Sequence, residues 1–133
     1  MIGGVRINQR DIVFIPFRYS DSNTEFKIRP ALIISNNKYN ENYDDVIVCA
    51  ITSSQETYPF VIEISESDLE TSKRFKKPSR IKYDSIGIID KKKYIQSIWG
   101  RVKKDVFKKV ILGIFELIKL EPDKYMELKE KIK

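Results

Sequence analysis

The stretch Arg29-Pro30-Ala31-Leu32-Ile33-Ile34-Ser35-Asn36 decides the fold together with a second one, Val46-Ile47-Val48-Cys49-Ala50-Ile51-Thr52-Ser53. Aliphatic and β-branched residues dominate both stretches, which is typical of β-strands. The first begins with an arginine, and the second ends in a threonine and a serine. Two such strands side by side would bring a fixed cation and a hydroxyl group to one edge of a sheet. That pair of groups suits a phosphodiester better than a hydrophobic partner.

Other short apolar stretches indicate a mainly β protein. Strands are expected over residues 11–17, 31–35, 46–52, 59–64, 79–83 and 86–90, and residues 91–99 are a candidate for one more. The polar ranges 18–28 and 65–77 are expected to be loops, the second with a short helical turn as the alternative, and 36–45 is expected to be a turn. Short strands at this regular spacing predict a small antiparallel barrel or sandwich.

The periodicity changes near residue 103. Apolar residues then recur at steps of three and four and predict one amphipathic helix over about 103–120. Glu121-Pro122 interrupts this helix, and Pro122 is compatible with the first turn of a second helix over 123–131. A chain of 133 residues is expected to form a single domain, 1–133, of which 121–133 is a marginal helical tail.

The composition excludes several classes of protein. With 41% hydrophobic and 33% charged residues the chain is expected to be soluble, and no apolar run approaches the roughly 20 residues that span a bilayer. Residues 1–6 lack the apolar region of a signal peptide, so we expect a cytoplasmic protein. There is no histidine and one cysteine, Cys49, which excludes a structural zinc site. An oxygen-only magnesium site is the alternative, but no tight acidic cluster indicates one, so we expect no metal or other cofactor. We also expect a buried, unreactive Cys49.

The net charge of +6 is concentrated in one part of the chain. Residues 73–109 carry fourteen basic and three acidic groups. Such a concentration is typical of nucleic-acid binding, although a solvated lysine-rich surface explains it equally well. The densest basic run contains Lys73, Arg74, Lys76, Lys77, Arg80 and Lys82, with Phe75 and Tyr83 beside it. These residue types track an RNA backbone and stack on its bases. The alternative is a flexible charged loop with Phe75 in the core.

Together these stretches resemble the MazF/PemK-type toxins of toxin–antitoxin pairs. The resemblance covers about residues 9–118 and rests on residues 11–17, the two stretches quoted first, residues 79–91, and Gly100-Arg101-Val102 before the helix. The chain departs from the family at Arg10, where glycine is usual, and in residues 18–28, which hold less glycine. The family implies a mainly β, SH3-like antiparallel barrel of the MazF/PemK/CcdB type with a C-terminal helix. It also implies a homodimer.

The resemblance further implies a metal-independent, sequence-selective endoribonuclease that a cognate antitoxin neutralises. Such an enzyme cleaves single-stranded RNA, including mRNA, by 2′-hydroxyl attack and leaves 2′,3′-cyclic phosphate and 5′-hydroxyl ends. By motif position, Arg29 and Thr52 correspond to its catalytic arginine and threonine. A guanidinium is always charged and can clamp two phosphate oxygens, and a threonine hydroxyl can donate one more hydrogen bond.

The remaining site residues are less defined. Lys27 would share a strand face with Arg29, and we expect it to bind RNA together with Ser53 and Gln55. No general base is evident, and the weaker candidates are Ser53, Gln55, Asp21 and Glu25.

Simpler interpretations of each feature remain open. Arg29 could be a surface residue paired with Glu41 or Asp45, and Thr52 could merely end a strand. Trp99 and Tyr94 are expected in the core or in a dimer interface. Two other function classes also remain: a non-catalytic toxin that binds a cellular enzyme such as a topoisomerase, and a nucleic-acid-binding module that uses residues 73–109.

Overall fold

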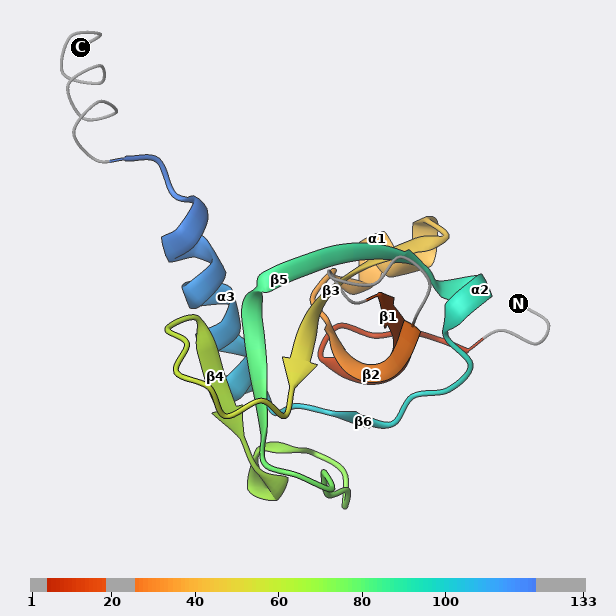
Figure 1. Cartoon of the computed structure of the whole chain (residues 1–133). Coiled ribbons are helices and arrows are strands. Elements are labelled where there is room, and N and C mark those ends of the chain that lie inside the picture. Colours follow the sequence, from red (N-terminus) through yellow and green to blue (C-terminus); the bar gives the residue numbers. More distant parts are fainter. Residues whose placement is uncertain (1–4, 19–25, 122–133) are drawn as a thin grey trace, which may run out of the picture.

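One antiparallel sheet organises this computed structural model, which describes residues 5–18 and 26–121 (Figure 1). Across the sheet the strands follow the order β4-β5-β3-β2-β1-β6. The strands are β1 Asp11–Arg18, β2 Phe26–Ile33, β3 Asp45–Thr52, β4 Val61–Ile64, β5 Ser79–Asp90 and β6 Gly100–Arg101. The helices are α1 Asn37–Asn42, α2 Lys91–Tyr94 and α3 Lys104–Ile118, and a 3₁₀ helix, η1, spans Glu66–Asp68.

The two edges of the sheet meet just beyond β4 and β6. Leu69, which follows η1, forms an antiparallel bridge with Val102. Next to this bridge, the Glu70 backbone N–H donates to the Arg101 carbonyl oxygen at 2.8 Å. The sheet therefore curls into a half-barrel, and the predicted mainly β antiparallel fold with a C-terminal helix is confirmed.

A buried ion pair joins β1 to β6. Asp11 is fully buried, and its carboxylate accepts hydrogen bonds from Arg101 Nε at 2.7 Å and from the Asn8 backbone N–H at 2.8 Å. A buried carboxylate that loses its cation is strongly destabilising, so these two residues depend on each other. The pair accounts for the aspartate at the start of the first strand and for the arginine that follows Gly100.

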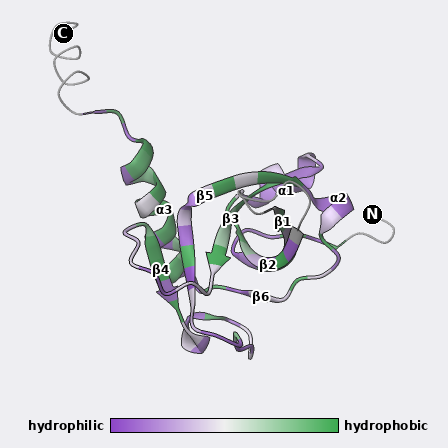
Figure 2. Ribbon diagram, viewed as in Figure 1, coloured by the Kyte–Doolittle hydropathy of each residue, from purple (hydrophilic) through white to green (hydrophobic). Residues whose placement is uncertain are grey.

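Two apolar clusters lie on opposite faces of the sheet, and β3 contributes to both. Cys49 and Ile51 belong to the cluster covered by α3, whereas Val46 and Val48 belong to the cluster on the other face. This alternation follows from the pleat of a strand that is buried on both sides, and the colouring of β3 in Figure 2 is mainly hydrophobic. Cys49 is the buried hydrophobe that the sequence predicts, and burial raises the pKa of its thiol to about 12.

Helix α3 packs across β4 and β5, and its buried residues are Val106, Phe107 and Val110 (Figure 1). Gly113 permits the closest approach, because a Cβ at this position would lie 2.7 Å from Tyr83 Cε1. The predicted amphipathic helix is confirmed. Among the helices that the structure describes, none combines the length and the apolar character needed to cross a membrane.

Two expectations about strands were wrong in their bounds. The strand that contains Arg29 begins at Phe26 and ends at Ile33, because pairing with β1 extends it into the polar range expected to be a loop. The ranges 79–83 and 86–90 form the single strand β5. Its register against β3 shifts between Cys49 and Ala50, which accommodates the polar residues between the two apolar ranges.

Two other segments are helical rather than turn or strand. Residues 36–45 contain α1, which begins where the Asn36 side chain accepts a hydrogen bond from the Tyr39 backbone N–H. Residues 91–99 begin with α2, because Asp90 caps the backbone N–H groups of Lys92 and Lys93. The alternative of a short helical turn within 65–77 matches η1. The expected helix over 123–131 lies outside the described residues.

Candidate functional site

A row of polar residues crosses neighbouring strands at one end of the sheet. Thr52 of β3 lies opposite Arg80 of β5, and Arg80 also lies opposite Glu63 of β4. The pairing of β2 with β3 ends at Ala31 and Ala50, so Arg29 and Thr52 each lie two residues beyond the last paired positions of these neighbouring strands. Directly opposed residues such as Thr52 and Arg80 share a face of the sheet, with Cβ atoms about 5 Å apart. Arg29 of β2 and Thr52 of β3 come from adjacent strands at the same end of the sheet.

Thr52 ends β3 and is partly buried. Its Oγ1 accepts a hydrogen bond from the Ser54 backbone N–H at 3.1 Å. Because a hydroxyl is both an acceptor and a donor, this bond leaves the hydroxyl hydrogen able to donate to another group. The side chain is thus oriented by the loop that follows the strand.

Arg80 holds that loop through backbone carbonyls. Its Nη1 donates to the carbonyl oxygens of Ser54 at 3.0 Å and Glu56 at 2.8 Å, and its Nη2 donates to that of Tyr58 at 3.5 Å. Its Nε is buried without a hydrogen-bond partner among the described residues. The donors of Arg80 are therefore largely committed to the loop, which sets it apart from the other basic residues predicted to bind RNA.

An aromatic hollow of about 590 Å³ lies beside Arg29. In it Phe75 and Trp99 stack with ring centroids 4.6 Å apart, and Phe14 meets Trp99 edge-on at 5.9 Å. Ile28 is 65% exposed there. Several polar residues singled out from the sequence also line this hollow: Lys27, Arg29, Ser53, Arg74, Lys76 and Lys77. The hollow thus combines apolar rings with cationic side chains.

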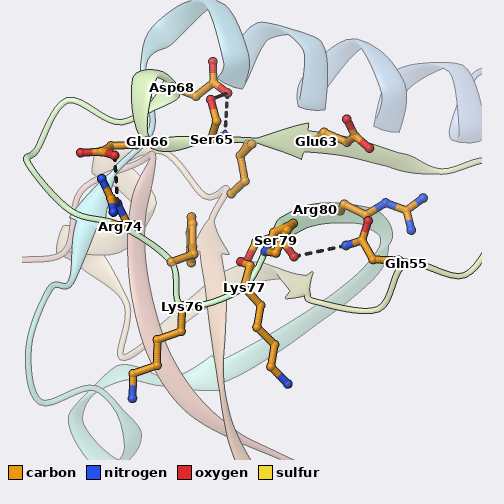
Figure 3. Close-up of a pocket in the computed structure, with 13 residues that line it drawn as sticks. Gln55, Glu63, Ser65, Glu66, Asp68, Arg74, Lys76, Lys77, Ser79 and Arg80 are labelled. Atoms are coloured by element: carbon orange, nitrogen blue, oxygen red, sulfur yellow. Dashed lines mark hydrogen bonds and ion pairs between the residues drawn. The ribbon is translucent and has the colours of Figure 1, made fainter.

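A charged hollow of about 610 Å³ shares Arg74, Lys76 and Lys77 with the aromatic hollow (Figure 3). Arg74 Nε lies 3.2 Å from Glu66 Oε2 in an exposed ion pair. Gln55 Nε2 donates to the carbonyl oxygens of Ser53 and Pro78, both at 3.2 Å. Exposed ion pairs contribute little to stability, so Arg74 can exchange Glu66 for a phosphate at small cost.

A smaller loop hollow of about 290 Å³ contains Thr52, and Glu56, Tyr58, Arg80 and Lys82 also line it. The Lys82 ammonium lies 4.6 Å from the centroid of the Tyr58 ring. The Tyr58 hydroxyl donates to Asp84, and this hydrogen bond raises the pKa of Tyr58. Sequence analysis did not single out Glu56 or Tyr58, because no local pattern marks them and only the folded loop brings them to Thr52.

The structure separates some residues that the sequence groups together. Arg29 lines the aromatic hollow, whereas Thr52 lines the loop hollow. The two hollows adjoin at the end of β3, where Ser53 lines the aromatic hollow. Lys73 lines another hollow with Tyr94 and Trp99. Glu41, an alternative partner for Arg29, pairs instead with Arg6 at 3.0 Å.

The candidate bases Asp21 and Glu25 lie outside the described residues. Within residues 5–18 and 26–121, no three acidic or cysteine side chains gather in a way that could hold a metal ion.

The comparison with protein families agrees with this fold. Residues 8–118 match the family of PemK-like, MazF-like toxins of type II toxin–antitoxin systems. The match covers most of the 133 residues, so the chain belongs to this toxin family, and the resemblance inferred from the sequence is confirmed. A search of curated proteins finds no match.

Solved structures with the same fold are distant in sequence. A MazE–MazF complex from Deinococcus radiodurans is 18% identical with a TM-score of 0.69, and the alignment covers 88% of this chain and 100% of that one. An endoribonuclease with its cognate antitoxin from a mycobacterial species is 18% identical with a TM-score of 0.66, over 86% and 97%. The Mycobacterium tuberculosis toxin MazF-mt6 is 16% identical with a TM-score of 0.65, over 84% and 99%.

Proposed function

We propose that this toxin is a sequence-selective endoribonuclease that cuts single-stranded RNA, such as mRNA, without a metal ion. The observation that carries the proposal is that Arg29 and Thr52 lie just beyond the last paired residues of two neighbouring strands, beside hollows lined with basic side chains. Membership of the toxin family and the fold shared with a mycobacterial endoribonuclease support it.

In the proposed reaction, the 2′-hydroxyl oxygen attacks the neighbouring phosphorus and the bond from phosphorus to the 5′-oxygen breaks. The 2′-hydroxyl loses a proton and the 5′-oxygen gains one, which leaves a 2′,3′-cyclic phosphate and a 5′-hydroxyl. Arg29 stabilises the charge on the phosphorane oxygens, and such a donor is typically worth about 3–4 kcal/mol. Thr52 donates a further hydrogen bond. Glu56 lines the same hollow as Thr52 and is our candidate for the general base.

The RNA strand would follow the basic rims of the aromatic, charged and loop hollows and of the neighbouring hollow that Lys73 lines. We propose that its phosphates contact the exposed residues Lys27, Lys73, Arg74, Lys76 and Lys77 and the partly buried Lys82, with Ser53 and Gln55 as hydrogen-bonding groups. The rings of the aromatic hollow offer apolar contact for an unstacked base. Binding through this many cations would weaken steeply as salt rises.

We propose a homodimer on the basis of apolar surface left exposed on β5 and α3. Ile86 and Ile88 of β5 are 46% and 63% exposed, and Phe115 and Ile118 of α3 are 55% and 74% exposed. Large apolar side chains that a fold leaves exposed are candidates for contact with another protein chain. The MazE–MazF complex of similar fold supports a cognate antitoxin as a second partner, and we propose that the toxin acts in the cytoplasm.

The test is incubation of the purified protein with end-labelled single-stranded RNA and mapping of the product ends. The proposal expects cuts at defined sequences with 2′,3′-cyclic phosphate ends, and no cut where a 2′-deoxynucleotide replaces the attacking nucleotide. RNA that stays intact would favour a protein-binding toxin. RNA that is bound with steep salt dependence but never cut would favour a nucleic-acid-binding module.

A further inference from the structure

We infer that Arg80 is the positioning residue that holds Thr52 and residues 53–58 ready for cleavage. The inference rests on the proposed function, because it assigns to Arg80 a role in that reaction other than contact with the RNA. It starts from three relationships in the structure: the register of Arg80, its carbonyl partners, and the hydrogen bond that one of those partners makes to Thr52.

A short chain of contacts connects the guanidinium of Arg80 to the Thr52 hydroxyl. Arg80 Nη1 donates to the Ser54 carbonyl oxygen at 3.0 Å. The backbone N–H of the same Ser54 donates to Thr52 Oγ1 at 3.1 Å. Arg80 is also the residue opposite Thr52 in the pairing of β5 with β3. From the position opposite Thr52, the guanidinium therefore holds the carbonyl group of the same residue whose N–H orients the Thr52 hydroxyl.

Besides Arg80, the Gln55 side chain ties the loop to the Pro78 carbonyl oxygen, and apolar packing adds little. Every residue of Ser53–Thr57 is exposed, so burial of apolar side chains contributes little to its order. Alternate residues of β5 supply contacts instead. Arg80 donates to three loop carbonyls, Lys82 lies over the Tyr58 ring, and Asp84 accepts from the Tyr58 hydroxyl. Arg80 is the member of this group that reaches the Thr52 end of the loop.

The geometry requires an arginine rather than a cation alone. A guanidinium presents donors in a planar fork and can bridge the carbonyls of Ser54, Glu56 and Tyr58 together. An ammonium group is a compact point charge on a flexible stem and cannot span them. The substitution Arg80→Lys therefore keeps the positive charge that an RNA phosphate would recognise but loses the bridge, which separates positioning from direct binding.

The experiment measures single-turnover cleavage and, separately, the Kd for an uncleavable RNA with one 2′-deoxynucleotide at the cut. For Arg80→Lys we expect cleavage at least tenfold slower with a Kd within about threefold of wild type. Arg6→Lys is the matched control, since Arg6 is exposed and pairs with Glu41 far along the chain from this loop. Unchanged cleavage in Arg80→Lys, or a loss seen only in Kd, overturns the inference.

A double-mutant cycle tests whether Arg80 acts through Thr52. In the Thr52→Ala background, Arg80→Lys should slow cleavage by less than about threefold, because the hydroxyl that Arg80 positions is already gone. Full additivity of the two losses contradicts the inference. If Arg80→Lys folds poorly, Arg80→Gln, which keeps donors but no charge, replaces it in the same cycle.

Amide hydrogen exchange provides a readout that does not depend on activity. The Ser54 amide, which donates to Thr52, should exchange at least tenfold faster in Arg80→Lys, whereas the Cys49 and Ile81 amides of the core strands should not change. Unaltered exchange at Ser54 overturns the positioning role even if wild type cuts RNA. Faster exchange at Ser54 in a protein that does not cut RNA contradicts the proposed function and leaves the structural coupling intact.

Discussion

Thr52 Oγ1 accepts the Ser54 backbone N–H at 3.1 Å, so the hydroxyl group is held at the end of β3 by the residue two positions later. Thr52→Val keeps the side-chain volume but removes this acceptor and the donor proposed for the phosphate. We expect single-turnover cleavage to slow roughly tenfold or more, the value of one well-placed hydrogen bond. Thr52→Ser keeps the hydroxyl and should stay within about threefold of wild type. Equal rates for the valine and serine variants would remove Thr52 from the reaction.

Metal removal tests the chemistry assigned to Arg29 and Thr52. Because both side chains are proposed to act on the phosphate directly, the rate of RNA cleavage should be the same in EDTA as in Mg²⁺. A magnesium-dependent nuclease assayed in the same buffers is the control for effective chelation. Loss of cleavage in EDTA with recovery on addition of Mg²⁺ would contradict a metal-independent reaction.

Arg10 stands where the family usually has glycine, and its backbone φ of 81° lies in the left-handed region. Two hydrogen bonds offset the cost of this backbone conformation: Arg10 Nη1 donates to Glu70 Oε1 at 2.7 Å and to the Val102 carbonyl oxygen at 2.8 Å. Arg10→Ala loses these bonds and keeps the strained backbone, whereas Arg10→Gly loses the bonds and relieves the strain. In urea titrations at pH 7, the alanine variant should be less stable than the glycine variant by about 1 kcal/mol.

The same contact predicts a dependence on pH. The hydrogen bond from Arg10 holds the pKa of Glu70 below its ordinary value. A carboxylate with a lowered pKa stabilises the fold above its unfolded pKa of about 4.3, and this stabilisation is lost as pH falls through the folded pKa. The stability difference between wild type and Glu70→Gln should therefore shrink as pH falls below about 4. A difference that is constant from pH 7 to pH 3 would contradict the ion pair.

Gly113 brings α3 against the ring of Tyr83. Alanine is a better helix former than glycine by about 1 kcal/mol, yet its Cβ would lie 2.7 Å from Tyr83 Cε1. Overpacking of this kind typically costs about 1–3 kcal/mol, so Gly113→Ala should lower the Tm. The double variant Gly113→Ala with Tyr83→Leu should lose less than the two single variants together. A raised Tm for Gly113→Ala alone would show that the contact is loose.

The parts of the fold that sequence predicted are those in which a local pattern coincides with burial. The apolar run of β3 is buried on both faces, and the residues of α3 at steps of three and four lie against the sheet. The start of β2 was not predicted, because its polar residues form a strand only through pairing with β1. Helix α1 was not predicted, because its Asn- and Asp-rich segment is typical of a turn. The helix begins at the hydrogen bond that the Asn36 side chain accepts.

The candidate site divides in the same way. Arg29 and Thr52 could be proposed from sequence because each sits at one end of an apolar run with a family motif around it. The role inferred for Arg80 could not, because its carbonyl partners at positions 54, 56 and 58 are brought to it only by the pairing of β5 with β3. From the sequence it is one more cation in a basic run.

The most direct test of the central claim compares wild type with Arg29→Ala on the same labelled single-stranded RNA under single-turnover conditions. Arg29 is partly exposed, so the variant should keep the far-UV CD spectrum and a Tm close to wild type. Loss of about 3–4 kcal/mol of transition-state stabilisation predicts cleavage slower by roughly 10²–10³-fold. A folded Arg29→Ala protein that cuts RNA as fast as wild type would contradict the account.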